Sequence, residues 1–122
     1  MKRVSAVVAV LLLALSAGLA DEIVTVYVDG KQVDFRPAAR VRAGTAYAPL
    51  RATAESLGAE VKWNAAAQMA SVCRSTLCVA VRKSDGITVD NQMLVPLRLL
   101  GEALGAQVAW DGGRRAVVIK SP

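Results

Sequence analysis

The sequence has 122 residues, with 15 basic side chains, 10 acidic side chains and no histidine. This length suits one domain rather than two independent cores, and the absence of histidine excludes Ser-His-Asp and Cys-His catalytic arrangements. The basic residues are scattered, without the Lys/Arg clusters of a nucleic-acid groove, so a nucleic-acid partner is not expected.

The N-terminus has the pattern of a secretory signal peptide. A positive start, Lys2–Arg3, precedes the apolar run from Val4 to Leu15, and small residues stand at the −3 and −1 positions of a cleavage site after Ala20. The run is too short for a permanent membrane span, although an uncleaved anchor is the alternative. We expect residues 1–20 to be removed, leaving a secreted or periplasmic (cell-envelope) domain over residues 21–122.

The exported part begins with a predicted β-hairpin. Ile23 to Val28 and Lys31 to Phe35 are strand-like and are joined by Asp29-Gly30, a pair typical of two-residue hairpin turns. A second tight turn is predicted at Ala43-Gly44, because glycine tolerates positive φ.

A short helix and another hairpin follow. Pro49 opens a helix whose apolar stripe contains Leu50, Ala54 and Leu57, and Gly58 ends it. Val61 and Trp63 then alternate as a predicted inward-facing pair, residues 64–68 turn, and Met69 to Cys73 form the returning strand.

Cys73 and Cys78 are predicted to form a disulfide. The four residues between them suit a hairpin that places the two cysteines opposite each other, and an exported chain can be oxidised. Free thiols are the alternative. A zinc-type site is not expected, because the chain has no further cysteine and no histidine. The next segment, residues 82–86, is read as a polar hairpin tip that is either solvated or contacts a partner.

The same sequence pattern then occurs a second time. Nine of the fifteen positions from Pro49 to Trp63 are identical in the segment from Pro96 to Trp110, always at an offset of 47. Asp90-Asn91 corresponds to the earlier tight turn. The second helix has its apolar stripe at Leu97, Leu100, Ala103 and Leu104 and ends at Gly105; Val108 and Trp110 alternate, and residues 116–119 return as a strand.

The repeated polar and aromatic residues allow two interpretations each. Arg51 and Glu55, like Arg98 and Glu102, form either a ligand or catalytic site or simple i,i+4 ion pairs; their duplication favours ion pairs. The two tryptophans are either core residues or a platform for stacking sugars. Their alternation with valine favours the core.

These segments together resemble a known family. The hallmark of a strand, Val-Pro-Leu-Arg, a helix ending in Leu-Gly-Ala and then Val-x-Trp-Asp is matched by Val95 to Asp111, and by Ala48 to Asn64 with Ala48 for Val and Asn64 for Asp. The chain is similar to the copper amine oxidase N-terminal-like domain, or stalk domain, of secreted and envelope proteins of bacteria. The resemblance covers essentially all of the exported chain and implies a fold rather than an activity.

The family name does not imply copper chemistry in this chain. Full-length copper amine oxidases carry the metal and the tyrosine-derived quinone in a separate catalytic domain. Without histidine, a three-imidazole site cannot form, and Tyr27 and Tyr47 lie in strand-like segments. Met69 and Met93 are soft ligands in type but are better explained as core residues. We expect no amine oxidase activity, no metal and no other cofactor.

The sequence therefore predicts an α+β fold in which an antiparallel, hairpin-rich sheet packs on two short helices. It is built from two copies of a strand-helix-hairpin repeat, at about residues 41–73 and 88–120, related by a pseudo-twofold axis. The predicted function is a non-catalytic envelope module that binds an envelope protein or polysaccharide or acts as a spacer, with a second copy of the chain as another candidate partner. The alternative is a secreted accessory subunit or inhibitor of a separately encoded enzyme. Besides the disulfide, the repeat residues expected to have structural roles are Pro49, Leu50, Arg51, Glu55, Gly58, Trp63, Pro96, Leu97, Arg98, Glu102, Gly105 and Trp110.

Overall fold

The structure is a computed structural model that describes residues 20–122. The predicted signal peptide therefore lies outside the described residues, except for Ala20. Within the described part, no helix is long and apolar enough to cross a membrane.

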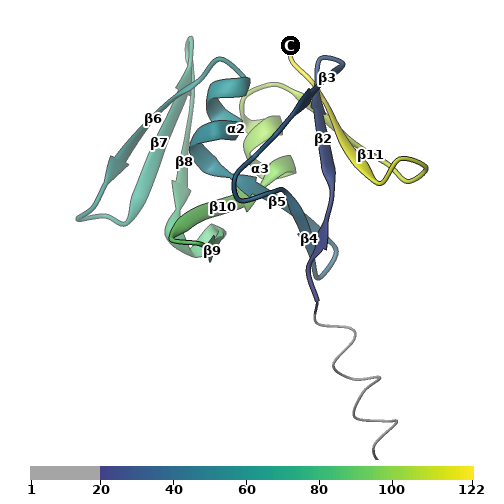
Figure 1. Cartoon of the computed structure of the whole chain (residues 1–122). Coiled ribbons are helices and arrows are strands. Elements are labelled where there is room, and N and C mark those ends of the chain that lie inside the picture. Colours follow the sequence, from purple (N-terminus) through teal and green to yellow (C-terminus); the bar gives the residue numbers. More distant parts are fainter. Residues whose placement is uncertain (1–19) are drawn as a thin grey trace, which may run out of the picture.

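The described chain consists mainly of β-strands, with two short α-helices and one 3-10 turn (Figure 1). In chain order the elements are β1 (Glu22–Ile23), β2 (Thr25–Val28), β3 (Lys31–Val33), β4 (Arg40–Arg42), β5 (Thr45–Pro49), α2 (Leu50–Ser56), β6 (Glu60–Asn64), β7 (Met69–Arg74), β8 (Leu77–Arg82), η1 (Lys83–Asp85), β9 (Ile87–Val89), β10 (Gln92–Pro96), α3 (Leu97–Ala103), β11 (Gln107–Asp111) and β12 (Ala116–Lys120).

The strands form three sheets around the two helices. The five-stranded sheet has the order β1-β4-β5-β10-β9, the four-stranded sheet β11-β12-β2-β3, and the three-stranded sheet β6-β7-β8. In Figure 1 the helices lie side by side between the three-stranded and four-stranded sheets, with β5 and β10 beneath them. The predicted antiparallel strands on two short helices are confirmed, although they are divided among three sheets.

The two repeats meet at the centre of the five-stranded sheet. Strands β5 and β10 pair antiparallel, with Ala48 opposite Val95, Pro49 opposite Leu94 and Tyr47 opposite Pro96. Because Ala48 and Val95 are themselves equivalent at the offset of 47, this register is the one that a twofold relation between the repeats requires. Ala48 and Val95 are fully buried, so the core is continuous across the junction.

The predicted helix stripes supply much of this core. Leu50, Ala54 and Leu57 of the first repeat are buried, as are Leu97, Leu100 and Leu104 of the second. Each helix starts directly after its proline and is followed by a glycine with positive φ, 76° at Gly58 and 84° at Gly105. A left-handed residue at this position is what glycine tolerates best. Both predicted helices are confirmed.

The predicted tight turns are also confirmed by their backbone angles. Asp29 and Gly30 have φ values of 50° and 81°, Ala43 and Gly44 have 51° and 81°, and Asp90 and Asn91 have 50° and 61°. Paired positive φ angles are typical of the two-residue turns that match the twist of a hairpin.

The outer strands break the symmetry of the repeats. Strand β8 follows β7 by a hairpin and runs antiparallel to it, whereas β12 pairs in parallel with β2 from the start of the domain. The prediction of a polar hairpin tip at residues 82–86 is wrong. Lys83–Asp85 form η1, which joins β8 in one sheet to β9 in another, so the flanking strands are not partners.

Candidate binding grooves

The two repeated tryptophans lie at the surface, contrary to the prediction that they belong to the core. The exposed fraction is 44% for Trp63 and 44% for Trp110. Their predicted alternation with valine is correct, since Val61 and Val108 are half-buried and pack against the core. What the pattern does not reveal is how much of that strand face is covered.

The short helices explain the exposure. A helix of seven residues is about 10 Å long, whereas a strand of five residues is about 17 Å long. On each strand the valine packs against the core, whereas the tryptophan two residues further along the same face lies beside the first turn of the helix, where the helix begins. Each tryptophan is the fourth residue of its strand.

Each tryptophan lines an open groove beside the first turn of a helix. The Trp63 groove is lined by Pro49, Leu50, Arg51, Val61, Trp63, Lys83, Thr88, Asn91, Gln92 and Met93. The Trp110 groove is lined by Glu22, Val41, Gly44, Thr45, Ala46, Pro96, Leu97, Arg98, Val108, Ala109, Trp110, Arg115 and Val117. Apart from Lys83, every residue of the first groove has its counterpart at the offset of 47 in the second. The structure thus contains two equivalent grooves.

Five of the positions that are identical in the two repeats line both grooves, and they form two groups. Proline, leucine and valine form the apolar base and are buried or half-buried, while arginine and tryptophan are exposed at the edge. The groove volumes are about 760 Å³ for Trp63 and about 410 Å³ for Trp110. Both fall in the range of small-molecule sites in proteins.

Ion pairs occupy the charged groups of the Trp110 groove. Arg98 donates to Glu102 at 3.1 Å, which confirms the predicted i,i+4 pair on the second helix. Arg115 pairs with Glu22, and its guanidinium carbon lies 5.6 Å from the centre of the Trp110 ring. The hydrogen bond from Arg115 lowers the pKa of Glu22, so this carboxylate stays ionised.

The charged groups of the Trp63 groove are all positive. Arg51 and Lys83 line it, no carboxylate does, and no ion pair in residues 20–122 involves either cation. The predicted pair between Arg51 and Glu55 is therefore not formed, although both side chains are exposed on the first helix. The amides of Asn91 and Gln92 add neutral donors and acceptors.

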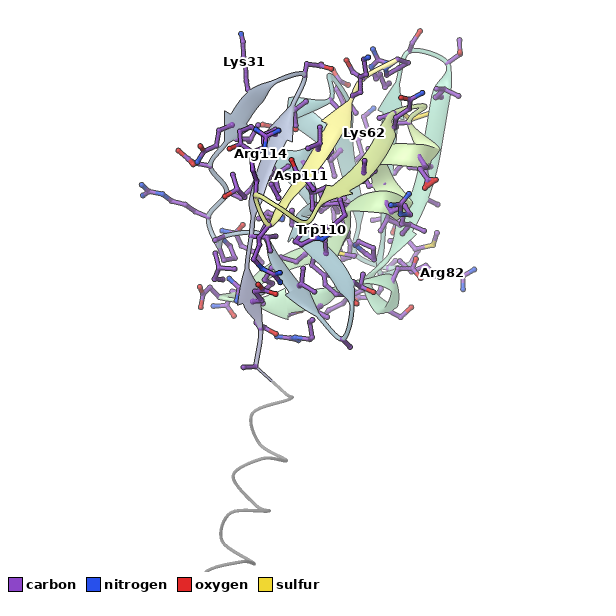
Figure 2. All side chains as sticks on the ribbon, turned by 90° about the vertical axis from the view of Figure 1, so that its right-hand side faces the viewer. Lys31, Lys62, Arg82, Trp110, Asp111 and Arg114 are labelled. Carbon is purple, nitrogen blue, oxygen red and sulfur yellow. A yellow bond between two sulfur atoms is a disulfide. The ribbon has the colours of Figure 1, made fainter. Side chains whose placement is uncertain are left out.

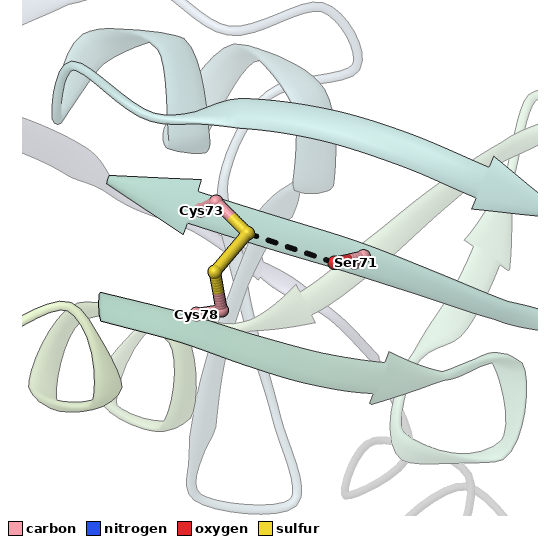
Figure 3. The surroundings of a disulfide bond; sticks show 3 residues. All are labelled: Ser71, Cys73 and Cys78. Atoms are coloured by element: carbon pink, nitrogen blue, oxygen red, sulfur yellow. Dashed lines mark hydrogen bonds between the residues drawn. A yellow bond between two sulfur atoms is a disulfide. The ribbon is translucent and has the colours of Figure 1, made fainter. Parts of the chain in front are cut away.

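The predicted disulfide is present outside the grooves. Cys73 and Cys78 face each other on β7 and β8 and are joined by a disulfide (Figure 3). The Ser71 hydroxyl lies 3.7 Å from the Cys73 sulfur. This covalent link belongs to the three-stranded sheet that carries Trp63, and it is the chemistry of an oxidising compartment.

The residues present do not fit the histidine-ligated copper site of full-length copper amine oxidases. The complete sequence has no histidine, and both cysteines are used in the disulfide. The described residues contain no group of three or more cysteine, aspartate or glutamate side chains placed to hold a metal. Met69 and Met93 are half-buried, and Met93 packs against the core.

A second cation–ring contact lies on the hairpin that carries Trp110. Arg114 donates to Asp111 at 2.9 Å, and its guanidinium carbon lies 4.9 Å from the centre of the Tyr27 ring. This hydrogen bond lowers the pKa of Asp111. Figure 2 shows Trp110, Asp111 and Arg114 on the same side of the molecule. These contacts hold the β11–β12 hairpin against the first strands.

The repeat pattern contains most residues of the Trp63 groove, but it predicts a buried environment for the tryptophans that the structure does not have. Nothing in the sequence pattern predicts Lys83, because it comes from the turn η1 between two sheets. The signal for the rest was the duplication itself: Arg51 and Trp63 recur as Arg98 and Trp110.

Comparisons with known proteins agree with this repeated architecture. The model of the family described as copper amine oxidase N-terminal domain matches twice, at residues 27–84 and 78–122. The chain has no significant match among curated proteins or among solved structures. The two family matches together extend from residue 27 to residue 122, far more than half of the sequence. The chain belongs to the copper amine oxidase N-terminal domain family.

Proposed function

We propose that the chain is a non-catalytic, extracytoplasmic module that binds a polysaccharide of the cell envelope. The observation that carries this proposal is the pair of equivalent grooves, each with a tryptophan that is 44% exposed beside a repeated arginine. An aromatic ring offers a flat apolar face on which a sugar ring can stack, and here each exposed ring lines a groove. The disulfide supports a location outside the cytoplasm.

A repeated groove suits a repeated ligand. A polysaccharide presents the same sugar many times, so two equivalent sites on one chain can engage one polymer together. Binding at each groove alone can then be weak while the combined affinity remains useful. The family match supports a non-catalytic accessory module, because both matches are to this N-terminal domain family and together they cover residues 27–122.

The test is sedimentation of the purified protein with insoluble envelope polysaccharide. Trp63→Ala and Trp110→Ala should each weaken binding roughly tenfold, which is the scale of a buried aromatic contact, and the double variant should stay in solution. Leu99→Ala is the matched control, since Leu99 is 45% exposed on α3 but lines neither groove.

Two results would overturn the proposal. One is sedimentation of the double tryptophan variant at the level of the unmodified protein. The other is capture of a single stoichiometric enzyme from the secreted fraction with no polysaccharide binding, which would favour an accessory subunit or inhibitor instead.

A further inference from the structure

The two grooves differ most in their charge. Of the groove-lining residues, Arg51 and Lys83 give the Trp63 groove two positive charges with no acidic group. The Trp110 groove also has two, from Arg98 and Arg115, but Glu22 lines the same groove. Glu102 neutralises Arg98 further, at 3.1 Å. An anion entering the Trp63 groove therefore meets unpaired cations, whereas one entering the Trp110 groove competes with carboxylates already in place.

The two tryptophan rings also differ in whether a cation lies over them. Arg115 stacks over Trp110, and no arginine or lysine in the described part of the chain stacks over Trp63. The counterpart of Arg115 in the first repeat is Gln68, which has a similar positive φ, 52° against 48°. Its side-chain amide donates to the Ala65 carbonyl at 2.7 Å, within its own turn. Trp63 thus presents a ring without a stacked cation beside two free cations.

We infer that the Trp63 groove is the site for a uronate, a sugar whose ring carries a carboxylate, within an acidic polysaccharide. This inference rests on the proposed function and assigns its ligand class. The sugar ring stacks on Trp63 and its carboxylate pairs with Arg51 and Lys83. An arginine fork matches a carboxylate in two-point geometry, and bonds between charged groups are about twice as strong as neutral ones. The charge complementarity and the single ring at the groove edge select this ligand.

The groove fits a uronate better than a nucleic-acid strand. Single-stranded nucleic acid is bound by successive aromatic rings along a continuous positive groove. Here a single tryptophan lines each groove. The Trp110 groove of the other repeat contains Glu22, so the two grooves do not form one continuous positive surface. The phosphate charge of a nucleic acid also lies on the backbone, away from the stacked ring, whereas a uronate has its charge on the ring itself.

The experiment is calorimetric titration with trigalacturonate and with its fully methyl-esterified form, which has the same rings without the charges. The acidic trimer should bind at least tenfold more tightly, because removing one charge-assisted hydrogen bond has about this effect. Arg51→Ala and Lys83→Ala should each reduce binding of the acid about tenfold and leave binding of the ester within twofold. Lys62→Ala is the charge-matched control: Lys62 is exposed on the same strand as Trp63 but does not line its groove.

The outcomes separate this inference from the proposed function. Equal affinity for acid and ester, lost in Trp63→Ala, would overturn the uronate assignment while supporting polysaccharide binding. Binding of a thymidine oligonucleotide as tight as that of the acidic trimer would overturn the assignment in favour of nucleic acid. Failure of both trimers and of envelope polysaccharide to bind would overturn both proposals. Arg51 and Lys83 are exposed, so thermal unfolding of each variant should match that of the unmodified protein.

Discussion

Thr53 is the one polar side chain in the buried core of residues 20–122. It is fully buried on α2, and its hydroxyl has no hydrogen-bond partner. Its counterpart in the second repeat is Leu100, which is equally buried and apolar. A buried hydroxyl without a partner destabilises a protein by about 1–3 kcal/mol. The first repeat thus carries an uncompensated polar atom where the second has a carbon.

Replacing this hydroxyl with a methyl group should stabilise the protein. We expect Thr53→Val to raise the free energy of unfolding by about 1 kcal/mol, because valine has nearly the same shape and similar helix propensity. Denaturant unfolding with an unchanged slope measures this difference. Thr76→Val, at an exposed turn position, should change stability by less than about 0.5 kcal/mol. A loss of stability in Thr53→Val would show that the hydroxyl is in fact satisfied.

At the level of elements, the extent of the short helices determines which strand residues are exposed. The alternation of Val61 and Trp63 correctly predicts that both face the same side of β6, but not that the second, beside the first turn of α2, is left exposed. A sequence pattern gives the face of a side chain, whereas its burial depends on how far the opposing element reaches. The same holds for Trp110 on β11.

The turn η1 is the element that brings Lys83 to the Trp63 groove. It is followed by Gly86, where a side-chain carbon would lie 2.3 Å from the Leu94 carbonyl oxygen. Leu94 is fully buried in β10, so this backbone cannot easily move away. The close approach of η1 to β10 therefore depends on glycine at this position.

Gly86→Ala should consequently destabilise the fold and disturb the groove. We expect a loss of about 2 kcal/mol in the free energy of unfolding, the usual scale of overpacking in a core, measured by denaturant titration. Gly113→Ala is the matched control, because its nearest neighbour, an Asp111 carboxylate oxygen, lies at an ordinary 3.5 Å. Equal effects of the two substitutions would contradict the tight packing at η1.

At the scale of the whole molecule, the start of the described chain fastens the two repeats together. Asp21 accepts a hydrogen bond from Arg42 at 2.7 Å, and Glu22 pairs with Arg115. Asp29 accepts bonds from the backbone and hydroxyl of Ser121, at 2.9 and 2.6 Å. These contacts join segments that are 21, 93 and 92 residues apart in the sequence.

The same contacts predict lower stability in acid. Hydrogen bonds from Arg42, Arg115 and Ser121 lower the pKa values of Asp21, Glu22 and Asp29 below their ordinary 3.8, 4.5 and 3.8. The unfolded chain then binds protons first, so this stabilisation is complete above the ordinary values and is lost as pH falls through the lowered ones.

Thermal unfolding between about pH 7 and pH 2 tests this prediction. The midpoint should be level above about pH 5 and fall below about pH 4. Asp29→Asn should reduce the steepness of the fall, because it removes one of the three carboxylates. A midpoint that rises on acidification would contradict the assignment.

The sequence predicts the repeated helices and turns well, because each depends on a short local pattern and each pattern occurs twice. The offset of 47 identifies the two helices, the turns at Gly44 and Asn91 and a twofold relation between the repeats, but not the pairing of β5 with β10 at the centre. It does not predict that β12 pairs in parallel with β2, since nothing local links residues 25–28 to 116–119. The pattern also does not predict the grooves, because they depend on how much of each strand face the helices leave exposed. It does not place Lys83 or Glu22 in them either, since neither residue lies in a duplicated segment.

The fluorescence of Trp63 reports directly on whether its groove binds a ligand. The sequence contains two tryptophans, so Trp110→Phe leaves Trp63 as the single reporter of its groove. We predict that acrylamide quenches this emission readily in the free protein and that saturating trigalacturonate protects it and shifts its spectrum. In Trp63→Phe, the emission of Trp110 should respond much less to the same ligand. A Trp63 signal that is shielded from acrylamide in the free protein, or that trigalacturonate leaves unchanged, would contradict a recognition role for this groove.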